Sequence, residues 1–262
     1  MSASFMDGDG LLQRLGRSVL SLVPRNAFMP VLSGINRGYR WRAGAGIHRC
    51  WLGRYEADKL ALLARVTPSG ATVYDIGAHA GYYSLAASRL VGPGGKVFAF
   101  EPDAGNLADL RQHVARNGLA NVTIVPSPVG QAHGTSVDFG SEHGSYQGHV
   151  IERGGSGGMR LVSLDGWRAE TGAPAPDVVK MDVEGFEVEA LDGGAGILAA
   201  ASAVWLIGLH GDRQTVGCFE RLRRHGYRIF EFSGHEIAEG APTGLFEIVA
   251  LPPGLEPRSL FG

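Results

Sequence analysis

Residues 73–81 read Val-Tyr-Asp-Ile-Gly-Ala-His-Ala-Gly, and residues 98–102 read Phe-Ala-Phe-Glu-Pro. The first stretch is a short apolar strand that runs into a glycine-rich turn, and the second is an apolar strand that ends in an acid. A helix is expected between them, beginning near Tyr82, with its free N–H groups directed at the turn. This order of strand, turn, helix and strand is typical of a nucleotide-binding βαβ unit.

The spacing within the turn favours S-adenosylmethionine over a dinucleotide. Dinucleotide sites carry the pattern G-x-G-x-x-G, whereas here Asp75 stands where the first glycine would be, ahead of Gly77 and Gly81. A carboxylate repels a pyrophosphate and attracts the ammonium group of S-adenosylmethionine. We therefore expect Asp75 to face that ammonium group. The glycines would let the backbone bend and the ligand approach, and Glu101 would accept hydrogen bonds from ribose hydroxyls.

The composition is that of a soluble globular protein. A chain of 262 residues with 44% hydrophobic residues and a formal charge of -2 is long enough for one α/β domain and an extension. Two cysteines, Cys50 and Cys218, are too few for a disulfide framework and suit a reducing cytoplasm. No secretory signal is evident, and the longest apolar stretch, residues 194–209, is too short to span a bilayer. We expect a cytoplasmic protein.

Charge divides the chain into a basic arm, residues 1–54, and a main domain, residues 55–262. The arm holds eight Arg and two Asp, a net charge of +6. Because the whole chain carries -2, residues 55–262 carry -8. Apolar residues recur at helical spacing within residues 11–25, which predicts a basic amphipathic helix. Such a helix can lie on an anionic membrane, although we favour packing on the domain or on the second copy of a homo-oligomer. No nucleic-acid-binding module is evident.

Strands and helices alternate through the main domain. This pattern predicts a seven-stranded, mostly parallel sheet with helices on both faces. Expected strands are residues 72–76, 96–100, 122–125, 178–181, 203–209, 227–232 and 246–251; expected helices are residues 55–66, 82–90, 106–116, 187–192 and 213–224. Residues 140–158 are rich in Gly and Ser and are expected to form a mobile loop between two short strands. That loop is either a lid or a hairpin without a role.

A second concentration of chemistry lies in residues 177–187, Asp-Val-Val-Lys-Met-Asp-Val-Glu-Gly-Phe-Glu. Acids crowded at a strand end repel one another, so a cation, a proton or Lys180 must compensate. In one interpretation Asp182 and Glu184 face the cofactor and the acceptor. In the other, Lys180 and Glu187 form a buried pair, and Glu184 stabilises a helix N-terminus.

Two of the nine histidines are candidates for proton transfer, because histidine titrates near neutral pH. His79 lies inside the glycine-rich turn, and His210 directly follows an expected strand. His113 stands in a charged helical context, which favours the surface. Ser127 follows the third strand, where it either reaches an adenine or is an ordinary turn residue.

Several motifs in one order resemble the FkbM-type methyltransferases, from about Trp51 to Phe232. The motifs are Leu52-Gly53-Arg54-Tyr55-Glu56, residues 75–81, Glu101-Pro102, Ser163-Leu164-Asp165 and Lys180 to Glu187. The resemblance implies a class I methyltransferase fold, which is Rossmann-like, with S-adenosylmethionine as methyl donor and a hydroxyl of a sugar, glycan or secondary metabolite as acceptor. It also implies that Tyr55 and Glu56 cover the cofactor. The full cofactor-binding set that we expect is Tyr55, Glu56, Asp75, Gly77, His79, Gly81, Glu101, Pro102, Ser127 and Asp182.

The chain departs from the family pattern at two positions. His79 stands where the family often has Asn, and Gly208-Leu209-His210 stands where it often has Glu-x-His. The second departure leaves His210 without its usual acidic neighbour. Some relatives in sugar O-methylation use a divalent metal, but beyond Asp182 and Asp212 the sequence offers no clear ligand set, so we expect no metal site.

The resulting hypothesis is O-methyl transfer, with His210 as general base and Asp182 or Glu184 as orienting group or alternative base. Two other hypotheses remain. One is a non-catalytic binding module on a methyltransferase fold that holds a partner through the basic arm. The other is an NAD-dependent oxidoreductase, which the missing third glycine disfavours.

Overall fold

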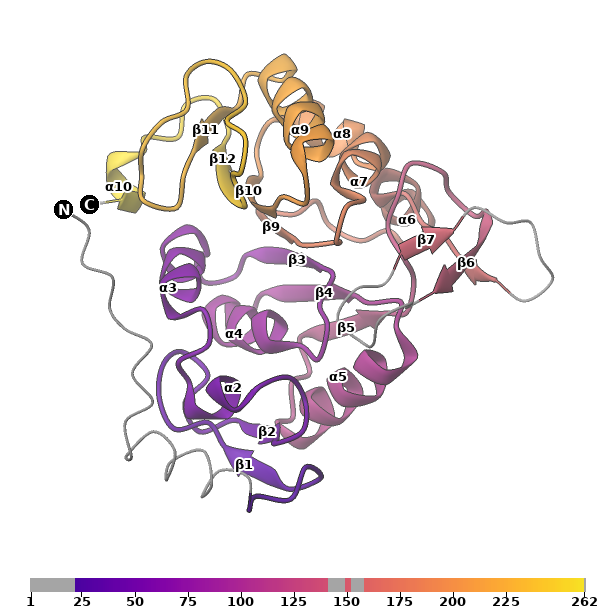
Figure 1. Cartoon of the computed structure of the whole chain (residues 1–262), viewed down its shortest axis with the longest axis vertical. Helices are drawn as coiled ribbons and strands as arrows, with labels where there is room; N and C mark the ends of the chain where they lie inside the picture. Colours follow the sequence, from indigo (N-terminus) through magenta and orange to yellow (C-terminus); the bar gives the residue numbers. More distant parts are fainter. Residues whose placement is uncertain (1–21, 141–148, 152–157, 262) are drawn as a thin grey trace.

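The computed structural model describes residues 22–140, 149–151 and 158–261. Its largest sheet has seven strands in the order β11-β12-β10-β9-β3-β4-β5 (Figure 1). The strands are β3 (Thr72–Ile76), β4 (Lys96–Phe100), β5 (Val122–Val125), β9 (Val178–Met181), β10 (Val204–Gly208), β11 (Arg228–Phe230) and β12 (Glu247–Leu251). Strands β10, β9, β3, β4 and β5 pair in parallel, and β12 runs antiparallel to both of its neighbours. This arrangement confirms the predicted fold class.

Helices cover both faces of this sheet. On one face lie α3 (Ala57–Val66), α4 (Tyr82–Val91) and α5 (Ala104–Arg116); on the other lie α6 (Leu164–Thr171), α7 (Glu187–Gly193), α8 (Ala195–Ala200) and α9 (Asp212–Arg224). Successive strand residues point to opposite faces, so Val73 packs with α3 and α4, whereas Tyr74 packs with Trp167 of α6. A short helix, α10 (Arg258–Phe261), contacts α3. Among the described residues no helix has the length and apolarity needed to cross a membrane.

The sheet changes its direction of winding between β3 and β9. The chain leaves β3 toward β4 and β5 on one side, and β9 and β10 follow on the other. In open α/β sheets a ligand binds outside the carboxyl ends of the strands at this switch point. Asp182 comes directly after β9, and His210 comes almost directly after β10. The fold therefore brings both residues to that edge of the sheet.

The described part of the basic arm packs on the main domain, and the division expected at residue 54 stays a prediction. Strands β1 (Phe28–Pro30) and β2 (Arg40–Arg42) form a hairpin, followed by helix α2 (His48–Leu52). Trp41 and Cys50 are buried in the same apolar cluster as α3 and α4. The amphipathic helix predicted in residues 11–25 lies mostly outside the described residues.

His113 of α5 is fully buried, so the surface position predicted for it is wrong. The hairpin covers it: Trp41 stacks on the imidazole at 4.0 Å, and the backbone N–H of Arg42 donates to its Nε2. The Arg42 guanidinium also pairs with Asp109 one turn earlier. Burial lowers the pKa of His113 to about 4. The face of α5 that carries Asp109 and His113 lies under the hairpin, while Arg111 and Arg116 are exposed, and local sequence could not reveal this division.

A smaller sheet stands outside the main one. Strands β6 (Ser136–Gly140), β7 (His149–Ile151) and β8 (Met159–Arg160) pair antiparallel in the order β7-β6-β8. Residues 141–148 and 152–157 of the predicted loop lie outside the described residues, and its role as a lid stays a prediction.

Candidate active site

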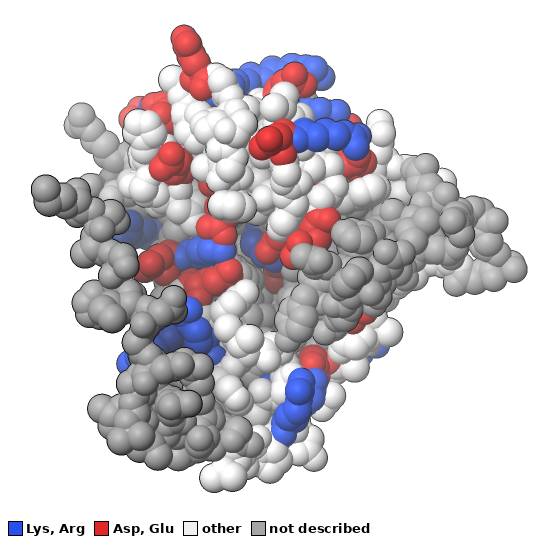
Figure 2. Space-filling view, in the orientation of Figure 1, with Lys and Arg blue, Asp and Glu red and all other residues white. Residues whose placement is uncertain are grey.

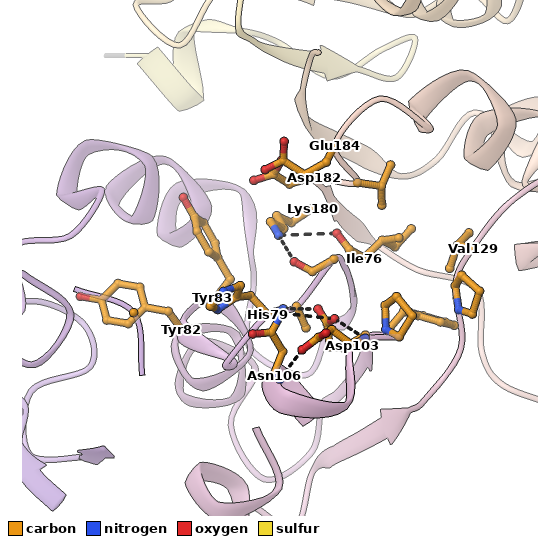
Figure 3. A pocket seen from close by; sticks show the side chains of 18 of the residues that line it. Ile76, His79, Tyr82, Tyr83, Asp103, Asn106, Val129, Lys180, Asp182 and Glu184 are labelled. Atoms are coloured by element: carbon orange, nitrogen blue, oxygen red, sulfur yellow. Dashed lines mark hydrogen bonds between the residues drawn. The ribbon is translucent and has the colours of Figure 1, made fainter. Parts of the chain in front are cut away.

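A cavity of about 450 Å³ opens at the carboxyl ends of the central strands (Figure 3). Asp182 and Glu184 lie at one end of it, His79, Asp103 and Asn106 lie at the other, and Lys180 lies between them. Acidic and basic side chains gather around the hollow in the middle of this face (Figure 2). Of the residues expected to bind a cofactor, the cavity is lined by Tyr55, Glu56, Gly77, His79, Glu101, Pro102, Ser127 and Asp182.

Glu101 lines the cavity and is held there by backbone hydrogen bonds. Its carboxylate is 5% exposed and accepts backbone N–H bonds from His79 at 2.7 Å and from Asp103 at 2.8 Å. Burial raises the pKa of Glu101, and the two backbone donors partly oppose that rise. These bonds tie the turn after β3 to the turn after β4 and fix the plane of the carboxylate. A carboxylate fixed in this way at a cavity wall suits a pair of ribose hydroxyls.

The glycines of the turn are required by packing against the protein as well as by backbone conformation. Gly77 and Gly81 have φ of 74° and 92°, a region that favours glycine. A Cβ at Gly77 would lie 1.8 Å from the carbonyl oxygen of Asp182, and one at Gly81 would lie 2.4 Å from Leu110. Gly81 does not line the cavity. At Gly77, which lines the cavity, packing against Asp182 alone excludes a side chain, whether or not a ligand approaches.

Asp75 does not line the cavity, and its expected contact with a ligand ammonium group is replaced by contacts inside the chain. Its carboxylate is 1% exposed, accepts a hydrogen bond from Ser84 Oγ at 2.5 Å and lies 3.3 Å from Lys180 Nζ. Lys180 in turn donates to the carbonyl of Gly77 at 2.7 Å. We call Asp75, Ser84, Lys180 and Gly77 the turn network. Burial opposes the charge on Lys180, but the carboxylates of Asp75, Asp182 and Glu56 together outweigh it and raise the pKa of the ammonium.

Tyr55 and Glu56 form a side wall of the cavity. Glu56 accepts hydrogen bonds from Tyr83 Oη and Lys59 Nζ, both at 2.7 Å. Burial, followed by the Glu56 charge, raises the pKa of Tyr83, so this phenol stays protonated and donates. Both residues line the cavity, and their predicted role of covering the cofactor stays a prediction.

Sequence reasoning missed several lining residues. Trp41 and Cys50 come from the basic arm, and Tyr83 and Phe186 from the elements after β3 and β9. Trp41 and Cys50 reach the cavity because the hairpin and α2 pack on α4 and α5, which only the tertiary structure shows. Tyr83 carries a local signal that could have been used, since it stands two residues beyond Gly81 at the start of α4.

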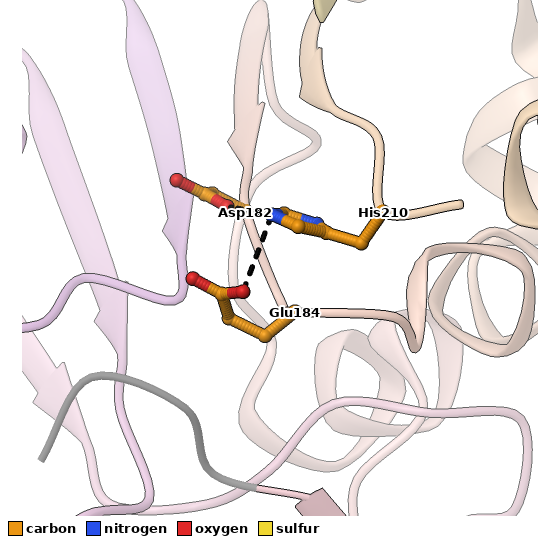
Figure 4. Close-up of side chains that lie close together, drawn as sticks. All are labelled: Asp182, Glu184 and His210. Atoms are coloured by element: carbon orange, nitrogen blue, oxygen red, sulfur yellow. Dashed lines mark ion pairs between the residues drawn. The ribbon is translucent and has the colours of Figure 1, made fainter. Parts of the chain in front are cut away.

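Asp182, Glu184 and His210 meet at the rim of the cavity and are called the rim cluster (Figure 4). The Nε2 atom of His210 lies 3.3 Å from Glu184 Oε2 and 3.6 Å from Asp182 Oδ1. All three side chains are between 34% and 46% exposed. Asp182 and Glu184 line the cavity itself, and Glu184 holds a left-handed φ of 52°.

His210 has an acidic partner despite the altered family motif. Its Nδ1 lies 2.8 Å from Oε1 of Glu187, which is fully buried. This hydrogen bond is the main cause of a raised pKa for His210, with the charges of Glu187, Glu184 and Asp182 adding to it and burial opposing it. The predicted alternative, a buried pair of Lys180 and Glu187, is wrong, since Lys180 pairs with Asp75 and Glu187 with His210.

Comparison with known proteins places these features in one family. The model of the methyltransferase FkbM domain matches residues 75–229. Hexuronic acid methyltransferase AglP of Haloferax volcanii is 28% identical over 153 residues, which are 58% of this chain and 61% of that protein.

Two solved structures resemble the chain more distantly. A methyltransferase FkbM from Methylobacillus flagellatus has a TM-score of 0.47 at 17% identity, over 69% of this chain and 43% of that one. A precorrin-6y C5,15-methyltransferase from Geobacter metallireducens has a TM-score of 0.48 at 19% identity, over 75% and 88%. By the match of its residues 75–229, this chain belongs to the FkbM methyltransferase family, whose methyl donor is S-adenosylmethionine.

Proposed function

We propose that this protein transfers a methyl group from S-adenosylmethionine to a hydroxyl of a sugar, glycan or secondary metabolite. The observation that carries the proposal is the position of the rim cluster, which borders the same cavity as the fixed carboxylate of Glu101. A donor site and a group of proton acceptors thus share one opening. The name of the Haloferax relative, a hexuronic acid methyltransferase, supports a carbohydrate acceptor.

In this proposal the cofactor lies along the turn after β3. Glu101 accepts hydrogen bonds from the ribose hydroxyls, Ser127 lies near the adenine, and His79 and Gly77 supply the turn. Tyr55 and Glu56 cover the ligand from the side. Asp182 is the carboxylate of the cavity that we assign to the cationic end of S-adenosylmethionine, in place of Asp75.

The acceptor hydroxyl would approach from the rim. When its oxygen attacks, the new O–CH₃ bond forms as the S–CH₃ bond breaks, and the hydroxyl proton passes to the rim cluster. His210 Nε2 is the first candidate for the base, because Glu187 holds the opposite ring nitrogen and fixes the ring. Asp182 or Glu184 orients the acceptor or serves as the alternative base.

The decisive experiment has two stages. Calorimetric titration with S-adenosylhomocysteine is expected to show micromolar binding, and NAD in the control titration is expected to show none. If folded protein does not bind S-adenosylhomocysteine, the proposal is overturned and a non-catalytic binding module is favoured. Binding of NAD alone would favour an oxidoreductase.

Turnover is then tested with hexuronic acid oligosaccharides and neutral sugars as acceptors. A methyl ether on a hydroxyl survives mild alkali, whereas a methyl ester on the uronic carboxyl does not. An alkali-stable product supports hydroxyl methylation, and an alkali-labile one contradicts it. The expected cytoplasmic location and homo-oligomeric state stay predictions.

A further inference from the structure

Three atoms with lone pairs converge at the rim of the cavity (Figure 4). They belong to the rim cluster, and one ligand atom from each of Asp182, Glu184 and His210 lies within 4.8 Å of the others. Because Glu187 occupies the Nδ1 side of the imidazole, Nε2 is the nitrogen that faces the two carboxylates. Two negative carboxylates and a nitrogen lone pair repel one another unless the imidazole is protonated or a cation lies between them.

A proton on Nε2 of His210 cannot form a good hydrogen bond to both carboxylates. A single N–H on Nε2 points to one acceptor, yet the two carboxylate oxygens stand at 3.3 Å and 3.6 Å, both beyond the usual hydrogen-bond length of about 2.9 Å. Divalent metals bind such atoms at about 2.0–2.2 Å, so two ligands at right angles lie about 3 Å apart. The observed separations from Nε2 exceed that value by only a few tenths of an ångström.

Rigid elements hold the two ends of the rim cluster. Asp182 follows β9 and His210 follows β10 almost directly, and these strands pair in parallel up to the register of Met181 with Ile207. The Glu187 carboxylate behind the imidazole is fully buried and also accepts the backbone N–H of Gly185. A histidine whose far nitrogen is held by a buried carboxylate is the common outer support of a metal ligand.

We propose that Asp182, Glu184 and His210 bind one divalent cation, whose remaining coordination positions face the cavity and take hydroxyl oxygens of the acceptor. Two carboxylates with one imidazole lie between the all-oxygen sets of Mg²⁺ and the nitrogen-rich sets of the later transition metals, which favours Mn²⁺. This proposal departs from the sequence-based expectation of no metal site.

The proposal rests on the proposed function and changes two roles within it, since Asp182 then binds the cation instead of the cationic end of S-adenosylmethionine. A bound cation lowers the pKa of a coordinated hydroxyl and holds it in place for attack. His210 then serves as a ligand and not as the base. The second oxygen of Asp182 or Glu184, which the cation leaves open, receives the proton.

The test is titration of the full chain with Mn²⁺, followed by electron paramagnetic resonance of the free aquo ion. One saturable site per chain is expected. The variants Asp182→Asn, Glu184→Gln and His210→Gln should each weaken Mn²⁺ binding at least about tenfold, and Glu187→Gln by on the order of tenfold. The matched control is Glu189→Gln on α7, which contacts Arg213 and Gln214 instead of the rim cluster and should bind Mn²⁺ like the parent.

Circular dichroism of the same samples verifies that each variant is folded, and calorimetry of the parent chain with S-adenosylhomocysteine separates the two proposals. If the parent shows no saturable Mn²⁺ site, or all variants bind Mn²⁺ equally as an adventitious ion only, the cation site is refuted. When S-adenosylhomocysteine still binds in that case, the proposed function survives. Binding of Mn²⁺ but not of S-adenosylhomocysteine would leave the cation site standing and overturn the function. Loss of turnover with EDTA and its recovery with Mn²⁺ would support both.

Discussion

The two groups of charged side chains beside the cavity, the turn network and the rim cluster, are built in opposite ways. In the turn network, Asp75 and Lys180 are buried, face one another and hold the backbone of Gly77. In the rim cluster, Asp182 and Glu184 are half-exposed, and like charges face one another across an imidazole. A buried network of mutually compensated charges stabilises the local backbone conformation. A half-exposed cluster of acidic side chains and an imidazole is more typical of a binding or catalytic site. Substitutions in the first should therefore change stability, and substitutions in the second should change turnover.

The largest effect is expected at Gly77. In Gly77→Ala the new Cβ meets the carbonyl of Asp182 in a left-handed backbone conformation, so the turn must move away from β9. We expect a loss of roughly 3–5 kcal/mol in the free energy of unfolding, together with loss of S-adenosylhomocysteine binding. Urea denaturation and calorimetry measure the two effects.

The control for Gly77→Ala is Gly94→Ala, where a Cβ meets no atom within 4 Å. This control should unfold like the parent. Equal destabilisation of both variants would show that the packing of the turn against β9 has no special importance.

Lys180→Met is expected to lower the free energy of unfolding by nearly as much as Gly77→Ala. It leaves the carboxylate of Asp75 buried without its cation, which typically destabilises by about 3–5 kcal/mol. Adding Asp75→Asn removes the orphaned charge, so the double variant should recover a large part of the loss. Denaturation of the parent, both single variants and the double variant gives the coupling energy. Additive effects would mean that the two side chains act independently.

The contribution of His113 to the free energy of unfolding is expected to be somewhat smaller and to depend on pH. Its pKa of about 4 in the folded chain lies below the unfolded value of about 6.5, so between these values the unfolded chain binds more protons. The free energy of unfolding then rises with pH across this window, and on the order of 3 kcal/mol is lost as the pH falls from about 6.5 to 4. Denaturation at several pH values should show a flatter profile for His113→Gln.

The control for this profile is His235→Gln at an exposed histidine. It should retain the slope of the parent. If the profile of His113→Gln keeps the same slope as well, burial of His113 under the hairpin is not the source of the pH dependence.

The sequence predicted the parts of the site that depend on neighbouring residues. Strand β3, the turn at Gly77 and the acid at Glu101 follow from a continuous local pattern, and all three lie where expected. Pairs that join distant segments were not predictable. Asp75 finds Lys180 on the adjacent strand, and Glu187 finds His210 after β10. Each carboxylate had several cations or histidines within reach in principle, and only the packing of strands and helices selects one.

The smallest effect on stability is expected in the rim cluster. This prediction tests most directly whether the rim cluster, unlike the turn network, affects turnover and not stability. Glu184→Gln keeps the shape of a side chain that is 35% exposed and removes one of the converging charges. We expect the free energy of unfolding to change by no more than about 0.5 kcal/mol, while kcat falls by about a hundredfold, the scale of a lost proton-transfer or orienting group. Turnover and denaturation are measured on the same preparation, with Glu189→Gln as the variant that should change neither. Marked destabilisation by Glu184→Gln would mean that the rim cluster is a structural network like the turn network, and the distinction between the two groups of charged side chains would fail.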